Sequence, residues 1–478
     1  MVNQKSVVAQ SRATPLDNLF LISERKALPM NIACIWEFAT EMTLQEAIDL
    51  NKPFVVSEAY RRYRQIVVGD PKTGDVMWTD FPEFKIEDHC IEHNLGGNGT
   101  KSDCEKVAGE ILSTSLDRSK PLWDCHLLTG LANGRSIMVY RLHHAITDGQ
   151  GSIRALLSVT TTKGTEQVQY SVGNRGDKKK RRRSSASSNK MSTKSTQMVV
   201  VNYLKQLQAF IFQLLFTLQC LLMALWDGLV LGFRPKVSFT KAAPNAEGIK
   251  SVAWTEGVPL EDVKIIKNAF GMTVNDVVLS VATGAIREYM VENNEPIQDL
   301  TVGIPFSMRS VNDEGLANKA TMAITFLPTS VADPKARMAF LHNRMNMLKL
   351  SPMPSVSYSS SNALYGSKLF LKMLHAFNNY LMDAGGNRLQ AVLTNVPGPA
   401  APLLIGGHEL TKYAPMIPQI NRSSLGMGVM SYNGKVFFGL LTEKGNLVGG
   451  SRAVVDKFEA QFSELLEEAK AMETKKIK

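Results

Sequence analysis

Cysteine is scarce and scattered in this chain of 478 residues, which limits the kinds of site that the sequence could build. The five cysteines form no C-x-x-C pair, which argues against structural zinc and against a disulfide framework, and favours a reducing compartment. We therefore expect no metal site. The segment MVNQKSVVAQSRATP at the start lacks the apolar core of a secretory signal, so no such signal is expected there. The cysteines are Cys34, Cys90, Cys104, Cys125 and Cys220.

Positive charge is unevenly distributed along the chain, although the formal net charge is +10. Six of these charges form the run KKKRRR at 178–183, so the rest of the chain is only mildly basic. The run contains no interleaved aromatic residues, which nucleic-acid surfaces commonly use for stacking. Nucleic-acid binding is therefore the least favoured class of function, and no nucleic-acid partner is expected.

A polar, basic and serine-rich segment at 171–196 divides the chain. Such a composition cannot bury enough apolar surface to offset the entropy of ordering, so it predicts a disordered linker. On either side of it, residues 1–170 and 250–478 mix strand-like and helix-like patterns. The sequence therefore predicts an N-terminal and a C-terminal domain.

An apolar segment at 197–235 follows the linker, and its centre AFIFQLLFTLQCLLMALW at 209–226 carries no charge. As a helix this centre would rise roughly 27 Å, at the short edge of a bilayer span. Gln206, Gln213 and Thr217 fall on one narrow seam, which suits a helix at a membrane interface, and the basic run would favour an anionic cytoplasmic leaflet. A buried helix connecting the two domains is the alternative interpretation.

The stretch RLHHAITDGQG at 141–151 places two of the eight histidines side by side. Residues 137–142 have the β-branched and aromatic pattern of a strand. If this strand continues, His143 and His144 point to opposite faces of the sheet. The segment AITDGQG is predicted as a loop, and residues 152–159 as a helix. The histidines would then lie at a strand end beside a glycine-rich turn, where catalytic groups often lie on a rigid support.

A neutral imidazole at this place could take a proton from a hydroxyl group near pH 7. The chain has no G-x-S-x-G elbow, and no cysteine lies in a nucleophile motif. For acyl transfer, these absences favour direct attack by an alcohol on an activated acyl group, without an acyl-enzyme. Two other interpretations stay open. One is a hydrogen-bonded structural imidazole, and the other is a zinc site, which the diverging directions of adjacent strand residues disfavour.

HHAITDG resembles the active-site motif of the wax ester synthase/diacylglycerol acyltransferase family, one of the CoA-dependent acyltransferases built like chloramphenicol acetyltransferase. Two features depart from the family pattern: the linker at 171–196, and Phe306, where the family more often has valine after the proline. Neither touches the implied chemistry. Further segments resemble family motifs in the same order over nearly the whole chain: ATPLDNLFL at 13–21, DRSKPLWDCHLL at 117–128, TVNDVVLSV at 273–281, PFSMRS at 305–310, TNVPGP at 394–399 and GMGVMSYNGKVFFGL at 426–440.

The resemblance implies an α/β fold of the α+β sandwich type, with two chloramphenicol acetyltransferase-like domains that contain mixed sheets. It implies a catalytic motif containing His143 and His144, with His144 as the general base. Asp148 is expected mainly to hold the loop, paired with an arginine. Gly149 is expected to leave room for the acyl or pantetheine chain.

Asn275 is implied to face the reaction centre, but the residues around it also have a local explanation. Thr273 and Asp276 have the spacing of a capping box that opens a helix over residues 277–290. Both interpretations can hold together, because Thr273 and Asp276 would cap the helix while Asn275 points elsewhere.

Pro121, Leu122 and Trp123 form the Pro-Leu-Trp element of the family, and the resemblance implies that they bind substrate. Their apolar character also suits an aromatic anchor in the core, which is the simpler interpretation. In a similar way, TNVPGP could serve only to shape a turn through Pro397 and Gly398.

Taken together, the resemblance implies an enzyme that moves a fatty acyl group from acyl-CoA to a long-chain alcohol or to diacylglycerol. Acyl-CoA would be a substrate, and no cofactor is expected. The acceptor would come from a membrane, so we expect a membrane-associated protein on the cytosolic face of the endoplasmic reticulum or at a lipid droplet. Two rivals remain: a condensation-domain-like acyltransferase, which would need carrier-protein partners, and a non-enzymatic membrane or lipid-droplet tether.

Overall fold

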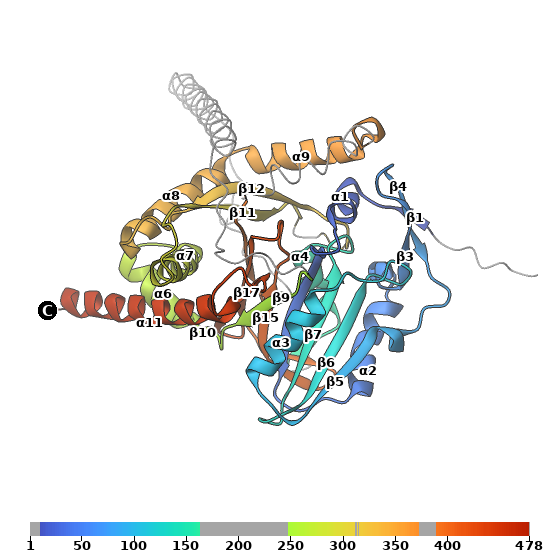
Figure 1. Cartoon of the computed structure of the whole chain (residues 1–478), viewed down its shortest axis with the longest axis horizontal. Coiled ribbons are helices and arrows are strands. Elements are labelled where there is room, and N and C mark those ends of the chain that lie inside the picture. Colours follow the sequence, from blue (N-terminus) through green and yellow to red (C-terminus); the bar gives the residue numbers. More distant parts are fainter. Residues whose placement is uncertain (1–9, 163–246, 311–312, 314, 372–388, 478) are drawn as a thin grey trace, which may run out of the picture.

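The computed structural model describes residues 10–162, 247–310, 313, 315–371 and 389–477 (Figure 1). Within these residues the chain forms two large mixed β-sheets, each beside its own buried apolar cluster. The predicted α/β fold with two domains and mixed sheets is therefore confirmed. The predicted linker at 171–196 and the apolar segment at 197–235 lie outside the described residues.

The first large sheet comes mainly from the N-terminal half and has the strand order β5–β6–β7–β2–β15–β14–β8. Its strands are β2 (Asn31–Phe38), β5 (Cys90–Gly99), β6 (Trp123–Leu131), β7 (Ser136–His143), β8 (Thr161–Thr162), β14 (Leu403–Ile405) and β15 (His408–Met416). A small sheet in the same half contains β1 (Gln10–Arg12), β3 (Gln65–Asp70) and β4 (Asp75–Asp80). The helices of this half are α1 (Pro15–Ser23), α2 (Leu44–Val56), α3 (Lys101–Leu112) and α4 (Gly149–Ser158), with short 3-10 helices at Glu58–Arg64 and Ile86–His89.

The second large sheet has the order β10–β17–β16–β13–β11–β12, and β9 also pairs with β17. Its strands are β9 (Lys250–Trp254), β10 (Val258–Pro259), β11 (Leu300–Ser307), β12 (Ala320–Leu327), β13 (Ala391–Pro397), β16 (Leu425–Tyr432) and β17 (Lys435–Glu443). The helices of this half are α6 (Leu260–Phe270), α7 (Val274–Glu292), α8 (Pro334–Leu350), α9 (Met353–Gly366) and α11 (Gly450–Ile477).

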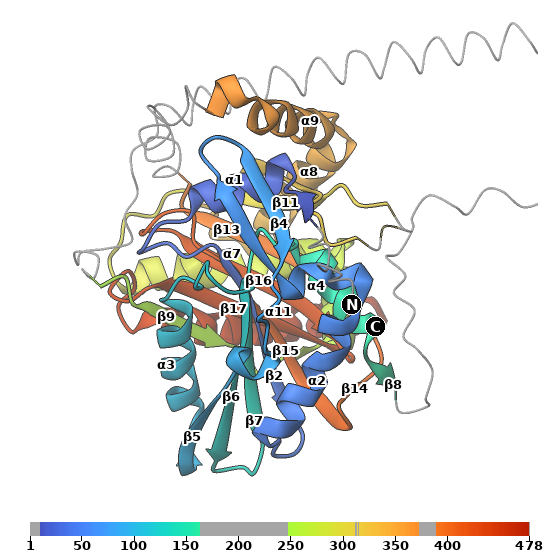
Figure 2. The ribbon, with the colours of Figure 1, turned by 90° about the vertical axis from the view of Figure 1, so that its right-hand side faces the viewer.

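Helices cover both faces of the first sheet, so every residue of β7 is buried. The ring of Tyr140 lies 6.4 Å from that of Phe54 on α2. The guanidinium of the next residue, Arg141, instead donates to the carbonyl oxygen of Ile111 on α3. Because consecutive strand residues point to opposite faces, α2 and α3 lie on opposite sides of the sheet (Figure 2).

The predicted division into an N-terminal and a C-terminal domain at the linker is too simple, as strand β15 shows. Although it lies within the predicted C-terminal domain, 250–478, it pairs antiparallel with β2 in the first sheet. It also passes close to β16 and β17, where glycines leave the space it needs. A Cβ atom on Gly428 would lie 2.6 Å from the carbonyl oxygen of Pro415, and one on Gly439 would lie 2.4 Å from it. The glycines of the segment GMGVMSYNGKVFFGL therefore allow one strand to join the two halves.

Local predictions around the histidine motif are confirmed in type and corrected in their boundaries. The predicted strand at 137–142 is β7, which extends one residue further at each end. The predicted loop is shorter than expected, because α4 already begins at Gly149. The Asp148 side chain caps this helix by accepting a hydrogen bond from the backbone N–H of Gly151 at 2.9 Å. Thr273 and Asp276 form the predicted capping box at the start of α7.

No single described helix has both the length and the apolar composition to cross a bilayer. Helices α6 and α7 meet that test only as a pair, and they are bent by 96° at their junction.

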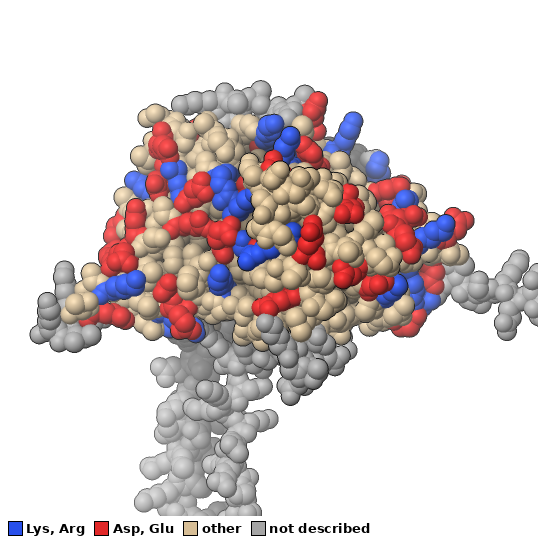
Figure 3. Space-filling model, turned by 90° about the horizontal axis from the view of Figure 1, so that it is seen from below, with Lys and Arg blue, Asp and Glu red and all other residues tan. Residues whose placement is uncertain are grey.

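The surface charge of the described residues is mixed. On the face shown in Figure 3, acidic and basic side chains are interspersed.

Candidate active site

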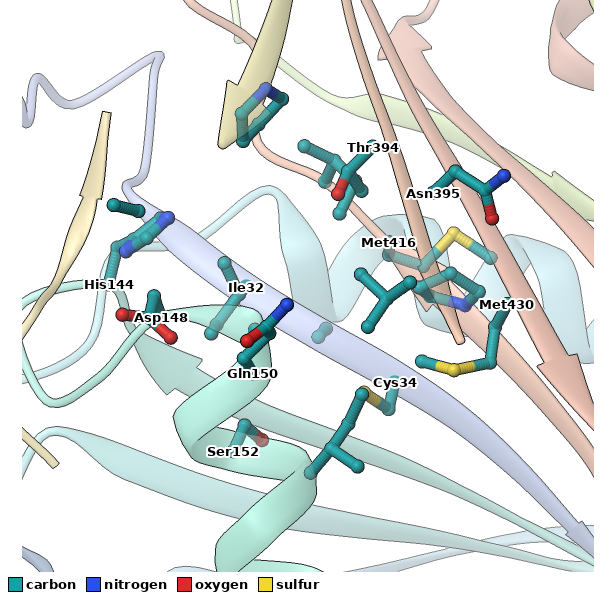
Figure 4. A pocket seen from close by; sticks show the side chains of 18 of the residues that line it. Ile32, Cys34, His144, Asp148, Gln150, Ser152, Thr394, Asn395, Met416 and Met430 are labelled. Carbon is teal, nitrogen blue, oxygen red and sulfur yellow. The ribbon is translucent and has the colours of Figure 1, made fainter. Parts of the chain in front are cut away.

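A cavity of about 130 Å³ opens where two parallel strands of the second sheet part (Figure 4). The last paired residues of β11 and β13 are Gly303 and Val392, and the two strands continue beyond them to Ser307 and Pro397. Crevices beyond the carboxyl ends of such strands commonly bind ligands in α/β proteins. Both halves contribute to the lining: Ile32, Ala33, Cys34, His144, Asp148, Gly149, Gln150, Ser152 and Ile153 from the first, and Pro305, Ser307, Ala320, Thr394, Asn395, Val396, Tyr413, Pro415, Met416, Ile417 and Met430 from the second.

His144 directly follows β7 and lines this cavity. Its backbone N–H donates to the carbonyl oxygen of Met30 at 2.7 Å, and the ring of Phe20 stacks on its imidazole, with centroids 3.7 Å apart. Burial lowers the pKa of the His144 imidazole below its usual value. The ring is therefore neutral at pH 7, and can accept a proton.

His143 has different surroundings and does not line the cavity. Its side chain is almost completely buried, and its Nδ1 accepts a hydrogen bond from the backbone N–H of Ala145 at 3.0 Å. Its Nε2 lies 3.6 Å from a carboxylate oxygen of Glu24. Although burial opposes this, contacts with His143 and Arg118 lower the pKa of Glu24 to about 2. These contacts are those of a structural imidazole, so His143 and His144 have different surroundings, as expected for two histidines with different roles.

Three polar side chains hold the turn that follows His144. Arg62 donates to the carbonyl oxygens of Ala145 and Ile146, at 3.1 and 2.8 Å, and forms an ion pair with the buried Asp17 at 2.6 Å. Asn318, from the other half of the chain, donates to the carbonyl oxygen of His144 at 2.8 Å. The backbone that carries the imidazole is thus fixed from both halves.

Asp148 forms a buried ion pair with Arg309, whose Nε lies 2.9 Å from one carboxylate oxygen. The backbone N–H of Lys319 donates to the other oxygen at 2.9 Å. The predicted pairing of this aspartate with an arginine is therefore present. Its partner lies in the segment PFSMRS, and no local sequence pattern connects that segment with Asp148.

The two glycines of the motif have different surroundings. A Cβ atom added to Gly149, which lines the cavity, would have no neighbour within 4 Å. One added to Gly151 would lie 2.0 Å from the Thr147 hydroxyl oxygen and 2.7 Å from a guanidinium nitrogen of Arg309. Gly149 therefore leaves open space in the cavity, whereas Gly151 allows close packing around the ion pair.

Asn275 lies behind the far end of the cavity and does not line it. Its Oδ1 accepts a hydrogen bond at 3.1 Å from Nδ2 of Asn395, which does line it. Figure 4 shows Asn395 and His144 at opposite ends of the cavity. The structure therefore does not bring Asn275 to His144, because the Asn275 amide oxygen bonds to Asn395 of β13 instead.

Pro121, Leu122 and Trp123 are buried in the first half of the chain, and none of them lines the cavity. The indole N–H of Trp123 donates to the carbonyl oxygen of Tyr63 at 2.8 Å, and its ring stacks on that of His89. These contacts favour the core-anchor interpretation over substrate contact. By contrast, TNVPGP does more than shape a turn, because Thr394, Asn395 and Val396 line the cavity from strand β13.

Two contacts beside the cavity had no recognisable signal in the sequence. Phe20 and Arg309 lie in segments that resemble family motifs, yet only the fold shows their contacts with His144 and Asp148. Within the described part of the chain, no three His, Cys, Asp or Glu side chains converge as a metal site.

The fold is that of two-domain acyltransferases and condensation domains. The wax ester synthase/diacylglycerol acyltransferase from Marinobacter aquaeolei VT8 matches it with a TM-score of 0.64 and 20% identity, over 96% of this chain and 100% of that one. The first condensation domain of the calcium-dependent antibiotic synthetase matches with a TM-score of 0.53 and 13% identity, over 96% of each chain. At these identities the likeness establishes the fold alone.

The sequence itself identifies the family. The model of the wax ester synthase/diacylglycerol acyltransferase catalytic domain matches residues 14–278, and that of the WS/DGAT C-terminal domain matches residues 316–466. The chain therefore belongs to the wax ester synthase/diacylglycerol acyltransferase family of acyltransferase enzymes. A putative diacylglycerol O-acyltransferase of Mycobacterium tuberculosis is 23% identical, over 96% of this chain and 91% of that protein. The O-acyltransferase WSD of Acinetobacter baylyi is 24% identical, over 89% and 91%.

Proposed function

We propose that this acyltransferase moves a fatty acyl group from acyl-CoA to a long-chain alcohol or to diacylglycerol, with His144 as the general base. One observation carries the assignment of the base: His144 is a histidine of lowered pKa that lines a cavity shared by both halves of the chain. The names of the relatives, which include diacylglycerol O-acyltransferases, support the choice of acceptor.

In this mechanism, Nε2 of His144 takes the proton of the acceptor hydroxyl group. The hydroxyl oxygen attacks the thioester carbonyl carbon and forms a tetrahedral intermediate. As the intermediate collapses, the C–S bond breaks and the CoA thiolate leaves, taking the proton from the imidazolium. The products are an ester and free CoA, and no acyl-enzyme forms. Nδ1 is buried, so Nε2 is the ring nitrogen left to face the substrate.

The other motif residues are assigned to positioning. Asp148 caps α4 and joins it to the second half of the chain through Arg309, and Gly149 leaves space beside the imidazole. A cavity of about 130 Å³ is smaller than the ~300 Å³ or more of most ligand pockets. It therefore suits the reacting ends of the two substrates, with their long chains extending out of it.

We further propose that the protein works on a membrane surface, at the cytosolic face of the endoplasmic reticulum or at a lipid droplet. Both acceptors are insoluble in water, so a membrane is their source. The uncharged segment at 209–226 and the basic run at 178–183 have the composition of an interfacial anchor.

Expression in a host that makes no neutral lipid tests the proposal. Thin-layer separation of the lipids would show wax esters, triacylglycerols or both with the wild-type chain, and neither with His144→Ala at equal protein level. If the wild-type chain produces neither lipid, the acyltransferase proposal fails. If His144→Ala still produces them, the assignment of the base fails.

A further inference from the structure

Helix α4 presents two polar side chains to the cavity at the end that holds His144. Gln150 and Ser152 both line the cavity, beside the apolar Ile153. In Figure 4, Gln150 lies toward the end with His144 and Asp148, whereas Asn395 and Met430 lie at the other end. Among the described residues, neither Gln150 nor Ser152 has a side-chain hydrogen-bond partner. The carboxamide of Gln150, with two N–H donors and one oxygen acceptor, is thus available to a ligand.

We propose that Gln150 selects the acceptor by donating a hydrogen bond to the ester carbonyl of diacylglycerol, and so favours diacylglycerol over a simple fatty alcohol. This inference rests on the proposed function, because it takes His144 as the base that receives the acceptor proton. Gln150 is six residues from His144 in the chain, and it lies in the first turn of α4, directly after the Asp148 cap.

Diacylglycerol and a fatty alcohol differ in the atoms next to the reacting hydroxyl group. In either case the reacting hydroxyl group must lie against His144, so the atoms next to that hydroxyl group lie at this end of the cavity. In diacylglycerol these atoms include an ester group on the neighbouring carbon. In a fatty alcohol they are only methylene groups, which would cover the Gln150 carboxamide without bonding to it.

When methylene groups cover the Gln150 carboxamide, the carboxamide loses its hydrogen bonds to water and gains none, which weakens binding of the fatty alcohol. Replacing the carboxamide by an apolar group removes this cost, and so favours the fatty alcohol. A site built to hydrogen-bond one substrate discriminates against an analogue that lacks the bonding atom. Gln150 is partly exposed when no substrate is present, so water can still reach part of its carboxamide. We therefore expect it to favour diacylglycerol over the fatty alcohol by about 10- to 100-fold and no more. The ion pair of Asp148 with Arg309 holds α4, and hence Gln150, in place.

The test compares the kcat/KM of the purified full chain for 1,2-dioleoylglycerol and for hexadecanol, with oleoyl-CoA as donor. Gln150→Met keeps the length of the side chain and removes its polar atoms. We expect it to lower the ratio of diacylglycerol to hexadecanol activity by at least about tenfold. Gln150→Glu, which can only accept hydrogen bonds when ionised, should lower the ratio as well. The matched control is Gln45→Met, at an exposed position on α2, which should leave the ratio unchanged.

A ratio within threefold of the wild type in Gln150→Met would overturn the inference while leaving the proposed function intact. An equal loss with both acceptors would also overturn it, since that result would mean that Gln150 serves the shared acyl-CoA. If the wild-type chain transfers acyl groups to neither acceptor, the proposed function fails and this inference fails with it. Thermal unfolding of each variant shows whether it is folded.

Discussion

The ring of Phe20 lies against the imidazole of His144, with centroids 3.7 Å apart and planes inclined by 8°. Phe20 belongs to α1, near the start of the described chain, and His144 directly follows β7, the strand that leads into the active-site motif. The contact covers one face of the proposed base and helps to keep water from it. Because burial is the main reason for the lowered pKa of His144, this packing bears on catalysis as well as on stability.

Replacing Phe20 with alanine should therefore change the pH dependence of the reaction. With water at its exposed face, the imidazole should have a pKa nearer the ordinary value, so the pKa rises. The acidic limb of kcat/KM then moves to higher pH. A pH profile of Phe20→Ala against the wild type measures this. Leu19→Ala, on the same helix, is the control, and an unmoved acidic limb in Phe20→Ala would contradict the account.

The ion pair of Asp148 and Arg309 should matter more for stability than an exposed pair. Both side chains are almost completely buried, so removing one leaves an uncompensated charge. We expect Asp148→Ala or Arg309→Leu to lower the free energy of unfolding by about 3–5 kcal/mol. The double variant should lose less than the sum of the two. Denaturant unfolding measures all three, and Lys52→Ala, which breaks an exposed pair with Asp49, should lower the free energy of unfolding far less than either buried-pair variant.

The glycines at 149 and 151 should separate activity from stability. A methyl group at Gly149 would enter open cavity space, so Gly149→Ala should fold normally and lower kcat/KM by obstructing the substrates. A methyl group at Gly151 would clash with Thr147 and Arg309, so Gly151→Ala should lower the melting temperature. Steady-state kinetics and thermal unfolding of both variants test this pair. Full activity in Gly149→Ala would argue that no substrate passes this residue.

Trp123 should behave as a core residue. Its side chain is buried, and it combines a hydrogen bond to the Tyr63 carbonyl oxygen with stacking on His89. Trp123→Ala should lower the free energy of unfolding by about 3–5 kcal/mol. Val56→Ala, at an exposed position on α2, should change it by less than about 0.5 kcal/mol. If Trp123→Ala instead raised KM without loss of stability, the substrate-contact interpretation would return.

What the sequence could predict was local. The strand that ends at His143 and the capping box at Thr273 depend on patterns within a few residues, and both are present. The loop after His144 was predicted in kind, but it is shorter than expected because α4 begins at Gly149. Motif resemblance, which extends along the chain, supplied the fold and the family as well.

What the sequence could not predict depends on distant pairs. Arg309 lies 161 residues from Asp148, and β15 pairs with β2 although more than 350 residues separate them. No local pattern encodes such pairings, because they form only when the whole chain has folded. For the same reason the motif could not decide between the two interpretations of Asn275, whose contact with Asn395 depends on a residue 120 positions away.

The most direct test of the central claim is the rate of ester formation by purified His144→Ala. With oleoyl-CoA and either acceptor, the account predicts a loss in kcat/KM of about 10²- to 10⁴-fold. Thermal unfolding should show a folded protein in the same preparation. A folded His144→Ala variant that keeps more than a tenth of the wild-type rate would contradict the claim that this imidazole activates the acceptor hydroxyl group.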